Sequence, residues 1–374
     1  MFILRAWKQL SLLTVLCLLG SVASSQIYDS ERYDFLLQTV TNGLERPLAL
    51  VFLSSEEILI AEQAGRLRWL VDGDLKEPAV SGLPEDFLDG DDHTYPVLLD
   101  LIRHADFDDQ PWLYFSYLAA SDDNDGTSIK VARGQFDNGA LSMLEELFST
   151  EVVNTREYVG GQLVMNSSNH LLMTLGDQGE PAMAMDTLSH AGSVIRLTDD
   201  GEVPEDNPWV GTDEGLDELY SWGHRHGIGF AIDPDTDQLW QVDQRPDNEA
   251  DRLQQIRAGR HYGWPEALVE NHGCCGTSAE SFDNQPQPWL EDAVASSLTF
   301  YQGDSFSEWS GSAFLSTVSG QRMLRLLPSD EGLVLQEPLV QEFNTPVRNV
   351  ITGADGTLWI LTDEDDARLM RFVR

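Results

Sequence analysis

The chain has 374 residues, 41% of them hydrophobic, which is enough apolar material for a large core and unlike the composition of a disordered chain. It carries 23 Lys and Arg against 63 Asp and Glu, a formal net charge of −40. A surface this acidic repels nucleic-acid phosphates and anionic lipid headgroups, so both are disfavoured as partners. Such a balance is typical of proteins kept soluble in concentrated salt, where screening weakens self-repulsion.

Residues 1–25 have the three-part pattern of a secretory signal peptide. Two cations, Arg5 and Lys8, precede an apolar run that ends in small residues. The run has roughly 14 residues, fewer than the ~20 that a spanning helix needs, so cleavage is favoured over membrane insertion. We expect a periplasmic or secreted protein whose mature part, residues 26–374, forms one domain.

Six segments of the mature chain share one pattern: a short apolar strand, a turn rich in Asp, Gly or Asn, and a second apolar strand. They are Leu48–Trp69, Leu98–Phe136, Gln162–Leu197, Gly229–Ile256, Leu298–Leu326 and Val347–Phe372. Repeats of roughly 50 residues that consist of strands indicate a β-propeller. We therefore predict an all-β, six-bladed β-propeller. The last segment has room for only three strands, so we expect the run Tyr33–Val40 to supply the fourth and close the ring.

The mature chain has two cysteines, Cys274 and Cys275, which are adjacent in a Gly-Cys-Cys-Gly stretch. In an oxidising compartment neighbouring thiols can form a strained ring that stiffens one turn. A pair of free or intermolecular thiols in a loop is the other interpretation, and the sequence leaves both open. Two cysteines do not make a zinc site here, because there is no second pair.

Several motifs occur in a fixed order along the repeats. They are Gly43-Leu-Glu-Arg-Pro-Leu-Ala-Leu50, Leu98-Leu-Asp-Leu-Ile-Arg-His-Ala-Asp-Phe107, Thr174-Leu-Gly-Asp-Gln-Gly179, Ser221-Trp-Gly-His-Arg-His-Gly227, His261-Tyr-Gly-Trp-Pro265 and Asp355-Gly-Thr-Leu-Trp359. With these motifs the chain resembles the soluble PQQ-dependent aldose sugar dehydrogenases, the glucose/sorbosone dehydrogenase family. The resemblance implies a six-bladed propeller that holds pyrroloquinoline quinone (PQQ) and calcium in a central groove. It also implies oxidation of the anomeric carbon of a small sugar, with hydride passing to the quinone.

The resemblance places Tyr158 where the family has the histidine that serves as general base. A phenol has a pKa of ~10 against ~6.5 for imidazole, so an unperturbed Tyr158 is protonated at neutral pH. The Arg of the family's Gly-His-Arg-Asn segment is kept as Arg225, and its Asn is replaced by His226. The candidate proton acceptors are therefore His226 and a perturbed Tyr158, and activity is expected to be altered or lost.

The positions that contact PQQ in the family are partly substituted. Tyr95 takes the place of a Gln, Ser319 takes the place of a Lys, and Arg348 is the one kept from an Arg-x-Arg pair. A quinone with three carboxylates needs cations or oriented donors, and Arg225 and Arg348 are the two cations retained. Two other arginines, Arg245 and Arg322, are candidates to compensate.

The segment that resembles the family's calcium site has also changed. An Arg, Arg252, occupies the position of a Glu, and an arginine does not ligate calcium. Glu249 and Asp251 lie close by in sequence, and Tyr262 belongs to the His-Tyr-Gly-Trp-Pro segment. These three residues are the candidate metal ligands. Because positions for both cofactors are substituted, the sequence leaves the binding of PQQ and of calcium open.

Two other function classes stay open. The first is a non-catalytic propeller that binds a carbohydrate or a protein through stacking aromatic side chains. Its candidate side chains are Tyr95, Tyr158 and Trp222. The second is a metal-dependent, lactonase-like hydrolase, which would need acidic side chains converging at the central channel. Its candidates are Asp177, Asp243 and Asp251.

Overall fold

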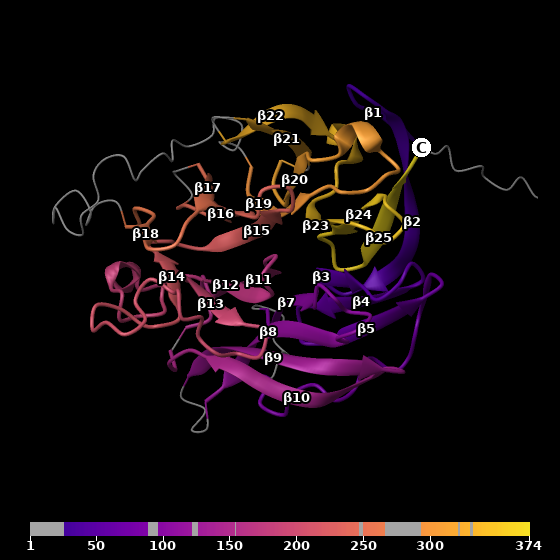
Figure 1. Cartoon of the computed structure of the whole chain (residues 1–374). Coiled ribbons are helices and arrows are strands. Elements are labelled where there is room, and N and C mark those ends of the chain that lie inside the picture. The colour runs from indigo at the N-terminus through magenta and orange to yellow at the C-terminus, as the bar shows by residue number, and fades with distance from the viewer. Residues whose placement is uncertain are drawn as a thin grey trace, which may run out of the picture.

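The computed structural model describes residues 26–88, 96–121, 126–153, 155–246, 250–265, 293–320, 322–329 and 332–374. Six sheets of mainly antiparallel strands surround a central axis, which makes the fold a six-bladed β-propeller as predicted (Figure 1). Within the described ranges, no helix has the length and apolar character needed to cross a membrane.

Each blade begins with a strand next to the axis. These inner strands are β3 (Pro47–Phe52), β7 (Leu98–Arg103), β11 (Gly160–Met165), β15 (Gly227–Asp233), β19 (Ala295–Phe300) and β23 (Val347–Thr352). The second strands are β4 (Glu57–Glu62), β8 (Trp112–Ala120), β12 (His170–Leu175), β16 (Gln238–Asp243), β20 (Ala313–Thr317) and β24 (Leu358–Thr362). The third strands are β5 (Leu67–Val71), β9 (Thr127–Asp137), β13 (Ser193–Thr198), β17 (Arg252–Ile256), β21 (Met323–Ser329) and β25 (Ala367–Val373).

The outer strands vary more than the inner ones. They are β6 (Asp74–Leu75), β10 (Ala140–Ser149), β14 (Leu219–Trp222) with β18 (Arg260–His261) beside it, β22 (Gly332–Leu339), and β2 (Asp34–Leu44) with β1 (Ile27–Asp29) beside it. Within the described residues, the short 3-10 helices η1 (Pro181–Met185), η4 (Ser307–Trp309) and η5 (Gln341–Phe343) lie in the connections. Second strands such as β24 are buried at every residue, since neighbouring blades cover both faces, which explains their continuous apolar sequences.

The ring closes through the N-terminal strand. β2 pairs with β25 in antiparallel register, for example Leu36 with Val373, so the first and last strands of the propeller share one sheet (Figure 1). The Phe35 ring stacks on that of Phe372 at 4.6 Å between centroids, within an aromatic cluster that includes Trp309. The predicted closure by the segment around residues 33–40 is confirmed.

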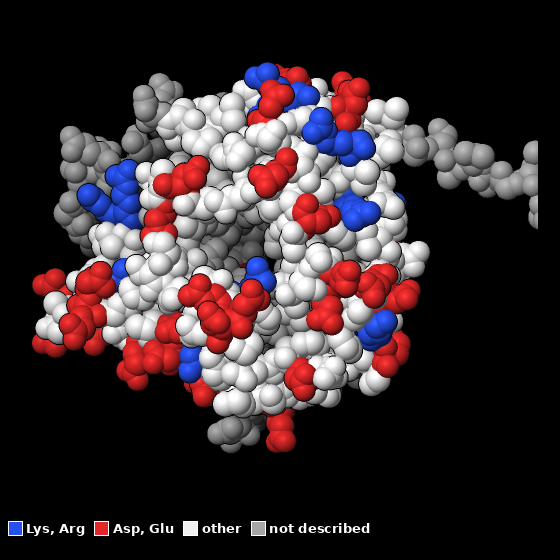
Figure 2. Space-filling view, turned by 45° about the vertical axis from the view of Figure 1, so that its right-hand side comes forward, with Lys and Arg blue, Asp and Glu red and all other residues white. Residues whose placement is uncertain are grey.

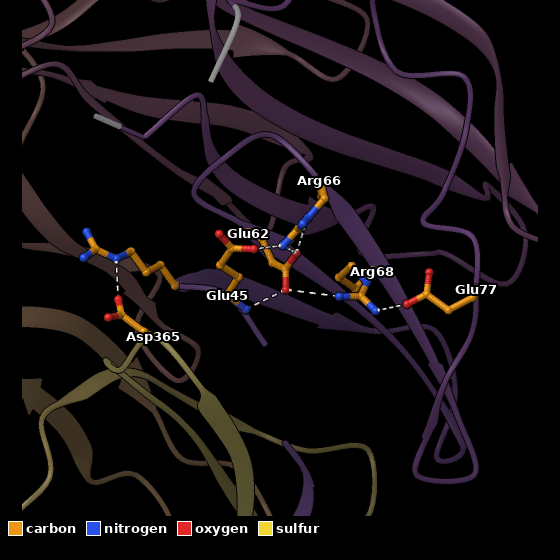
Figure 3. A network of polar contacts seen from close by, with 7 residues as sticks. Glu45, Glu62, Arg66, Arg68, Glu77 and Asp365 are labelled. Atoms are coloured by element: carbon orange, nitrogen blue, oxygen red, sulfur yellow. Dashed lines mark hydrogen bonds and ion pairs between the residues drawn. The ribbon is translucent and has the colours of Figure 1, made fainter. Parts of the chain in front are cut away.

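A buried charge network stabilises the first blade (Figure 3). The Glu62 carboxylate is fully buried and accepts hydrogen bonds from the Glu45 backbone N–H and from Arg66 Nε, both at 2.7 Å. Arg68 lies 3.4 Å from Glu62 and pairs with Glu77 at 2.7 Å. Because the charge of Glu62 is met by two guanidinium groups, its burial is compensated.

The acidic run from Asp363 to Asp366 joins the last blade to the first. Asp365 pairs with Arg46 at 3.0 Å, and Asp366 accepts a hydrogen bond from the Gly43 backbone N–H. A run of acids is more often a solvated turn, but here Asp365 contacts the loop that leads into β3 and Asp366 contacts the end of β2.

All six inner strands carry a β-bulge close to their first residue. The register shifts fall at Pro47/Ala49, Leu98/Asp100, Gly160/Leu163, Gly227/Gly229, Ala295/Ser297 and Val347/Asn349. A bulge bends its strand and increases its twist, so the same distortion occurs in every blade where the strand enters the ring. Figure 2 shows a hollow at the centre of the ring.

Candidate active site

The predicted catalytic residues meet at one end of the ring. Tyr158 lies two residues before β11, and Arg225 and His226 directly precede β15, the inner strand of the next blade. Asp243, the last residue of β16, is fully buried and accepts hydrogen bonds from the backbone N–H groups of Arg225 (3.0 Å) and His226 (2.7 Å). One carboxylate therefore fixes the backbone of both residues.

The Arg225 guanidinium lies between two aromatic rings. It sits 4.1 Å from the ring centroid of Tyr158 and 5.7 Å from that of Trp264, distances typical of cation–π contacts. One of its nitrogens donates to the Gln244 backbone carbonyl at 3.2 Å. No carboxylate of the described residues forms an ion pair with Arg225. The other N–H groups of its guanidinium are therefore available to bind an anionic or hydroxyl-bearing ligand.

His226 is held as a neutral imidazole. Its Nδ1 lies 2.9 Å from Oε1 of Gln244, so the ring proton is on Nδ1 and Nε2 keeps its lone pair. Burial lowers the pKa of His226 below its ordinary value of 6.5, although the bond to Gln244 and the charge of Asp243 act in the other direction. The His226 ring meets that of Tyr158 edge-on at 5.7 Å. At neutral pH, His226 Nε2 can therefore accept a proton.

Tyr158 has a left-handed backbone, with φ of 50°. Gly176, in the following turn of the same blade, packs directly against it: a Cβ on Gly176 would lie 1.7 Å from the Tyr158 carbonyl oxygen. Only glycine fits at position 176, and this close approach sets the direction in which the Tyr158 side chain leaves the backbone.

The three carboxylates proposed for a hydrolase lie around this site, but each binds protein N–H groups. Asp177 accepts from Trp264 Nε1 at 2.8 Å, and Asp251 accepts from the backbone of Arg245 (3.1 Å) and Ala295 (3.2 Å). Burial raises the pKa of Asp177, and that of Asp251 to about 6. Across the described ranges, no three acidic, histidine or cysteine side chains group as metal ligands. Among the described residues there is therefore no such group of side chains to bind the metal ion of the proposed hydrolase.

Two predicted cofactor residues lie at the same end of the ring without touching Arg225. Ser319 Oγ accepts the Val294 N–H at 2.6 Å. Arg348 pairs with Asp363 through two hydrogen bonds, at 2.9 and 3.3 Å, so its charge is already matched. Tyr95 lies outside the described residues.

Of the three predicted metal ligands, Asp251 and Tyr262 lie in the described part of the structure. Glu249 lies outside the described residues, as do Cys274 and Cys275. The Tyr262 hydroxyl donates to the Gln255 carbonyl at 2.8 Å and accepts the Arg257 N–H at 2.8 Å, and its ring stacks on His224. Burial raises the pKa of the Tyr262 phenol, whose two hydrogen bonds to the backbone support the local fold.

Two neighbours of the site were not assigned roles from the sequence. Gln244 sets the tautomer of His226, and Trp264 covers Arg225. The signal for Trp264 was present in the His-Tyr-Gly-Trp-Pro motif, whereas Gln244 follows β16 without any motif. Trp222, a proposed stacking face, is only 8% exposed and packs edge-on against Trp209 at 5.1 Å, so it belongs to the core.

Comparison with known proteins agrees with this geometry. The sequence profile described as glucose/sorbosone dehydrogenase matches residues 44–371. The chain belongs to this family. An uncharacterised protein of Synechocystis is 30% identical over 93% of this chain and 89% of its own length. The aldose sugar dehydrogenase YliI of Escherichia coli is 27% identical over 90% of this chain and 92% of its own length.

This chain has the same fold as a solved structure that is described as the PQQ-bound form of an aldose sugar dehydrogenase from Streptomyces coelicolor. The two superpose with a TM-score of 0.71 over 90% of this chain and 96% of the other, at 22% identity. At that identity the likeness shows the propeller fold.

Proposed function

We propose that this glucose/sorbosone dehydrogenase family member oxidises a CH–OH group of a small aldose and that His226 accepts the hydroxyl proton. The observation that carries the proposal is the His226–Gln244 pair, because it leaves Nε2 of a neutral imidazole unprotonated beside Tyr158 and Arg225. A positioned base of this kind contributes ~10²–10⁴ in rate. Names of relatives such as aldose sugar dehydrogenase support the choice of substrate class.

The site fits PQQ at one of its carboxylates. The Arg225 guanidinium, with its faces covered by Tyr158 and Trp264, offers a planar donor edge that suits a carboxylate. Arg348 would have to share its charge with Asp363, and the Ser319 hydroxyl would add one donor. When bound, PQQ supplies a two-electron acceptor for hydride. Among the described residues, no three acidic, histidine or cysteine side chains group as ligands for calcium.

Each residue of the site then has a distinct task. His226 Nε2 receives the proton, while Gln244 holds the imidazole in the required tautomer. Tyr158 orients the sugar through its hydroxyl and contacts the Arg225 guanidinium with its ring face. Asp243 keeps the backbone of Arg225 and His226 in register, so that the base and the cation face the same space.

A dye-reduction assay with added PQQ and a panel of aldoses tests the proposal. We expect His226→Gln to lower kcat by about 10²–10⁴, while His170→Gln, a histidine of β12 outside the site, serves as the matched control. Because burial lowers the pKa of His226, activity should be constant at neutral pH and fall as the pH drops through that lowered pKa. Unchanged turnover and an unchanged pH profile in His226→Gln would rule out this role.

We also propose export to the periplasm or the medium, followed by cleavage after residue 25 and leaving residues 26–374 as one domain. The basic, apolar and small-residue pattern of residues 1–25 supports this proposal. N-terminal sequencing of the protein recovered from the exporting cell should begin at Gln26. A protein that keeps Met1 in a purely intracellular fraction would contradict it.

A further inference from the structure

A cavity of about 360 Å³ lies between the inner strands. Its lining includes Ala105, Pro234 and Gln302, which follow β7, β15 and β19, so it extends away from the end of the ring where Tyr158 and His226 lie. At ~30 Å³ per water molecule the cavity has room for about a dozen waters. It is therefore large enough for a hydrated ion and separate from the candidate active site.

One carboxylate on the cavity wall is nine-tenths buried. Asp100 is 8% exposed, and its two oxygens accept the backbone N–H groups of Leu101 (2.8 Å) and Leu163 (2.7 Å). Each oxygen keeps a further lone pair. Burial raises the pKa of Asp100 to about 6. Arg103 lines the same cavity, but its guanidinium lies over the Phe107 ring at 5.8 Å and does not pair with Asp100.

No Lys or Arg of the described residues forms an ion pair with Asp100. A buried carboxylate without a compensating positive charge is unfavourable, and a cation in the cavity would relieve that cost. Such a cation would bind to the carboxylate oxygens of Asp100 through their remaining lone pairs.

Three of the five strand positions equivalent to Asp100 carry neutral polar side chains that line the cavity. Asp100 is the third residue of its inner strand, and the equivalent residues of the other five are Ala49, Gln162, Gly229, Ser297 and Asn349. Asn349 donates through Nδ2 to the Leu48 carbonyl, so its Oδ1 can accept or ligate. The Gln162 amide makes no hydrogen bond to a described residue, and its backbone adjoins Leu163, which binds Asp100. Ala49 and Gly229 contribute no bulky side chain that would fill the space.

We propose that the channel binds one monovalent cation, Na⁺ or K⁺, at the Asp100 carboxylate. A single carboxylate balances a single positive charge, whereas calcium sites usually collect several carboxylate oxygens. Amide and hydroxyl oxygens of the equivalent strand positions are hard ligands suited to such an ion, and the remaining volume retains its water. The site does not use the residues of the proposed dehydrogenase function.

Anomalous diffraction from crystals grown in RbCl or soaked in thallium acetate locates the ion directly. We expect a peak in the channel within bonding distance of an Asp100 carboxylate oxygen. A channel without a peak beside Asp100 overturns the proposal. The measurement needs no activity, so it is independent of whether the dehydrogenase function holds.

Thermal unfolding in KCl or NaCl, compared with choline chloride at equal ionic strength, separates binding from charge screening, because carboxylate and amide oxygens cannot coordinate the alkylated nitrogen of choline as they coordinate an alkali ion. The wild-type protein should gain a further, saturable rise in Tm of about 2 °C in the alkali salts. Asp100→Asn should lose this increment, and Gln162→Leu, which leaves the carboxylate bonds intact, should raise the half-saturating concentration. Asp109→Asn, an exposed carboxylate in the turn after the same strand, is the matched control and should keep the increment. Equal shifts in the two kinds of salt overturn the proposal.

Discussion

Replacing Glu218 by Gln should lower the free energy of unfolding by about 2 kcal/mol at mildly acidic pH. His190, which is 7% exposed, lies between two carboxylates, with Nδ1 2.6 Å from Glu151 and Nε2 2.6 Å from Glu218. Glu151 follows β10, while His190 and Glu218 precede β13 and β14, so the cluster joins two blades. Glu218 is the less exposed partner, at 20% against 62% for Glu151, and so has the stronger bond.

The pH dependence follows from the two pKa shifts. Burial alone would lower the pKa of His190, but its hydrogen bonds to Glu218 and Glu151 outweigh burial and raise it above 6.5. The stabilisation from His190 is therefore complete below pH 6.5 and is lost as the pH rises through the raised value. The bond to His190 lowers the pKa of Glu218, so its contribution is complete above pH 4.5 and is lost as the pH falls through the lowered value. The cluster should stabilise most between pH 4.5 and 6.5.

Urea unfolding of the wild type, Glu218→Gln and Glu151→Gln at about pH 5.5 and about pH 9 measures this effect. Glu151→Gln is the matched control, since a mostly exposed partner contributes less than about 1 kcal/mol. The loss in Glu218→Gln should shrink at the higher pH, where less of His190 carries the second proton. Equal losses in the two variants, or a larger loss at high pH, would refute the reasoning.

Three further outcomes are expected. Arg225→Gln should weaken PQQ binding, followed by Trp fluorescence, by about tenfold or more; Arg348→Gln should weaken it less, because Asp363 already neutralises Arg348, and equal effects would contradict this. Phe35→Ala, which removes a 1% exposed ring stacked on Phe372, should destabilise the protein by about 3–5 kcal/mol in chemical unfolding; a loss below 1 kcal/mol would mean that closure does not depend on this contact. Given the net charge of −40, Tm should rise with choline chloride concentration through screening alone, and a falling Tm would exclude self-repulsion as a major cost.

The fold was predictable because the repeat is visible in the sequence. Apolar strand pairs at regular spacing predict blades, and the incomplete last repeat predicts that an N-terminal strand such as β2 must complete it. The convergence of the site residues follows from the same repeat. Tyr158 lies two residues before the inner strand β11, and Arg225 and His226 precede β15, the inner strand of the next blade.

Contacts that depend on strand register were not predictable. Gln244 meets His226 because Asp243 pairs with Gly227 across β15 and β16, and no sequence motif reports that register. Arg348 was expected to serve a cofactor carboxylate, yet Asp363 of the neighbouring strand end pairs with it.

The hydroxyl of Tyr262, a candidate metal ligand in the sequence, forms hydrogen bonds with the backbone of Gln255 and Arg257, which no motif indicates. Motif matching identifies which side chains can reach a site. It does not show which of these side chains already form hydrogen bonds or ion pairs with other residues of the protein.

The pairing of β2 with β25 makes the order of synthesis matter. β25 (Ala367–Val373) leaves the ribosome after all the other described strands, and until it does β2 lacks its partner in the closing sheet and the circle stays open. The nascent chain is therefore a row of separate sheets, and the sheet that closes the ring is completed only when β25 pairs with β2. The partners Leu36 and Val373 are adjacent, so a short linker could join β25 to β2. New termini could then be placed in a surface turn of any other blade, which would give a circularly permuted chain.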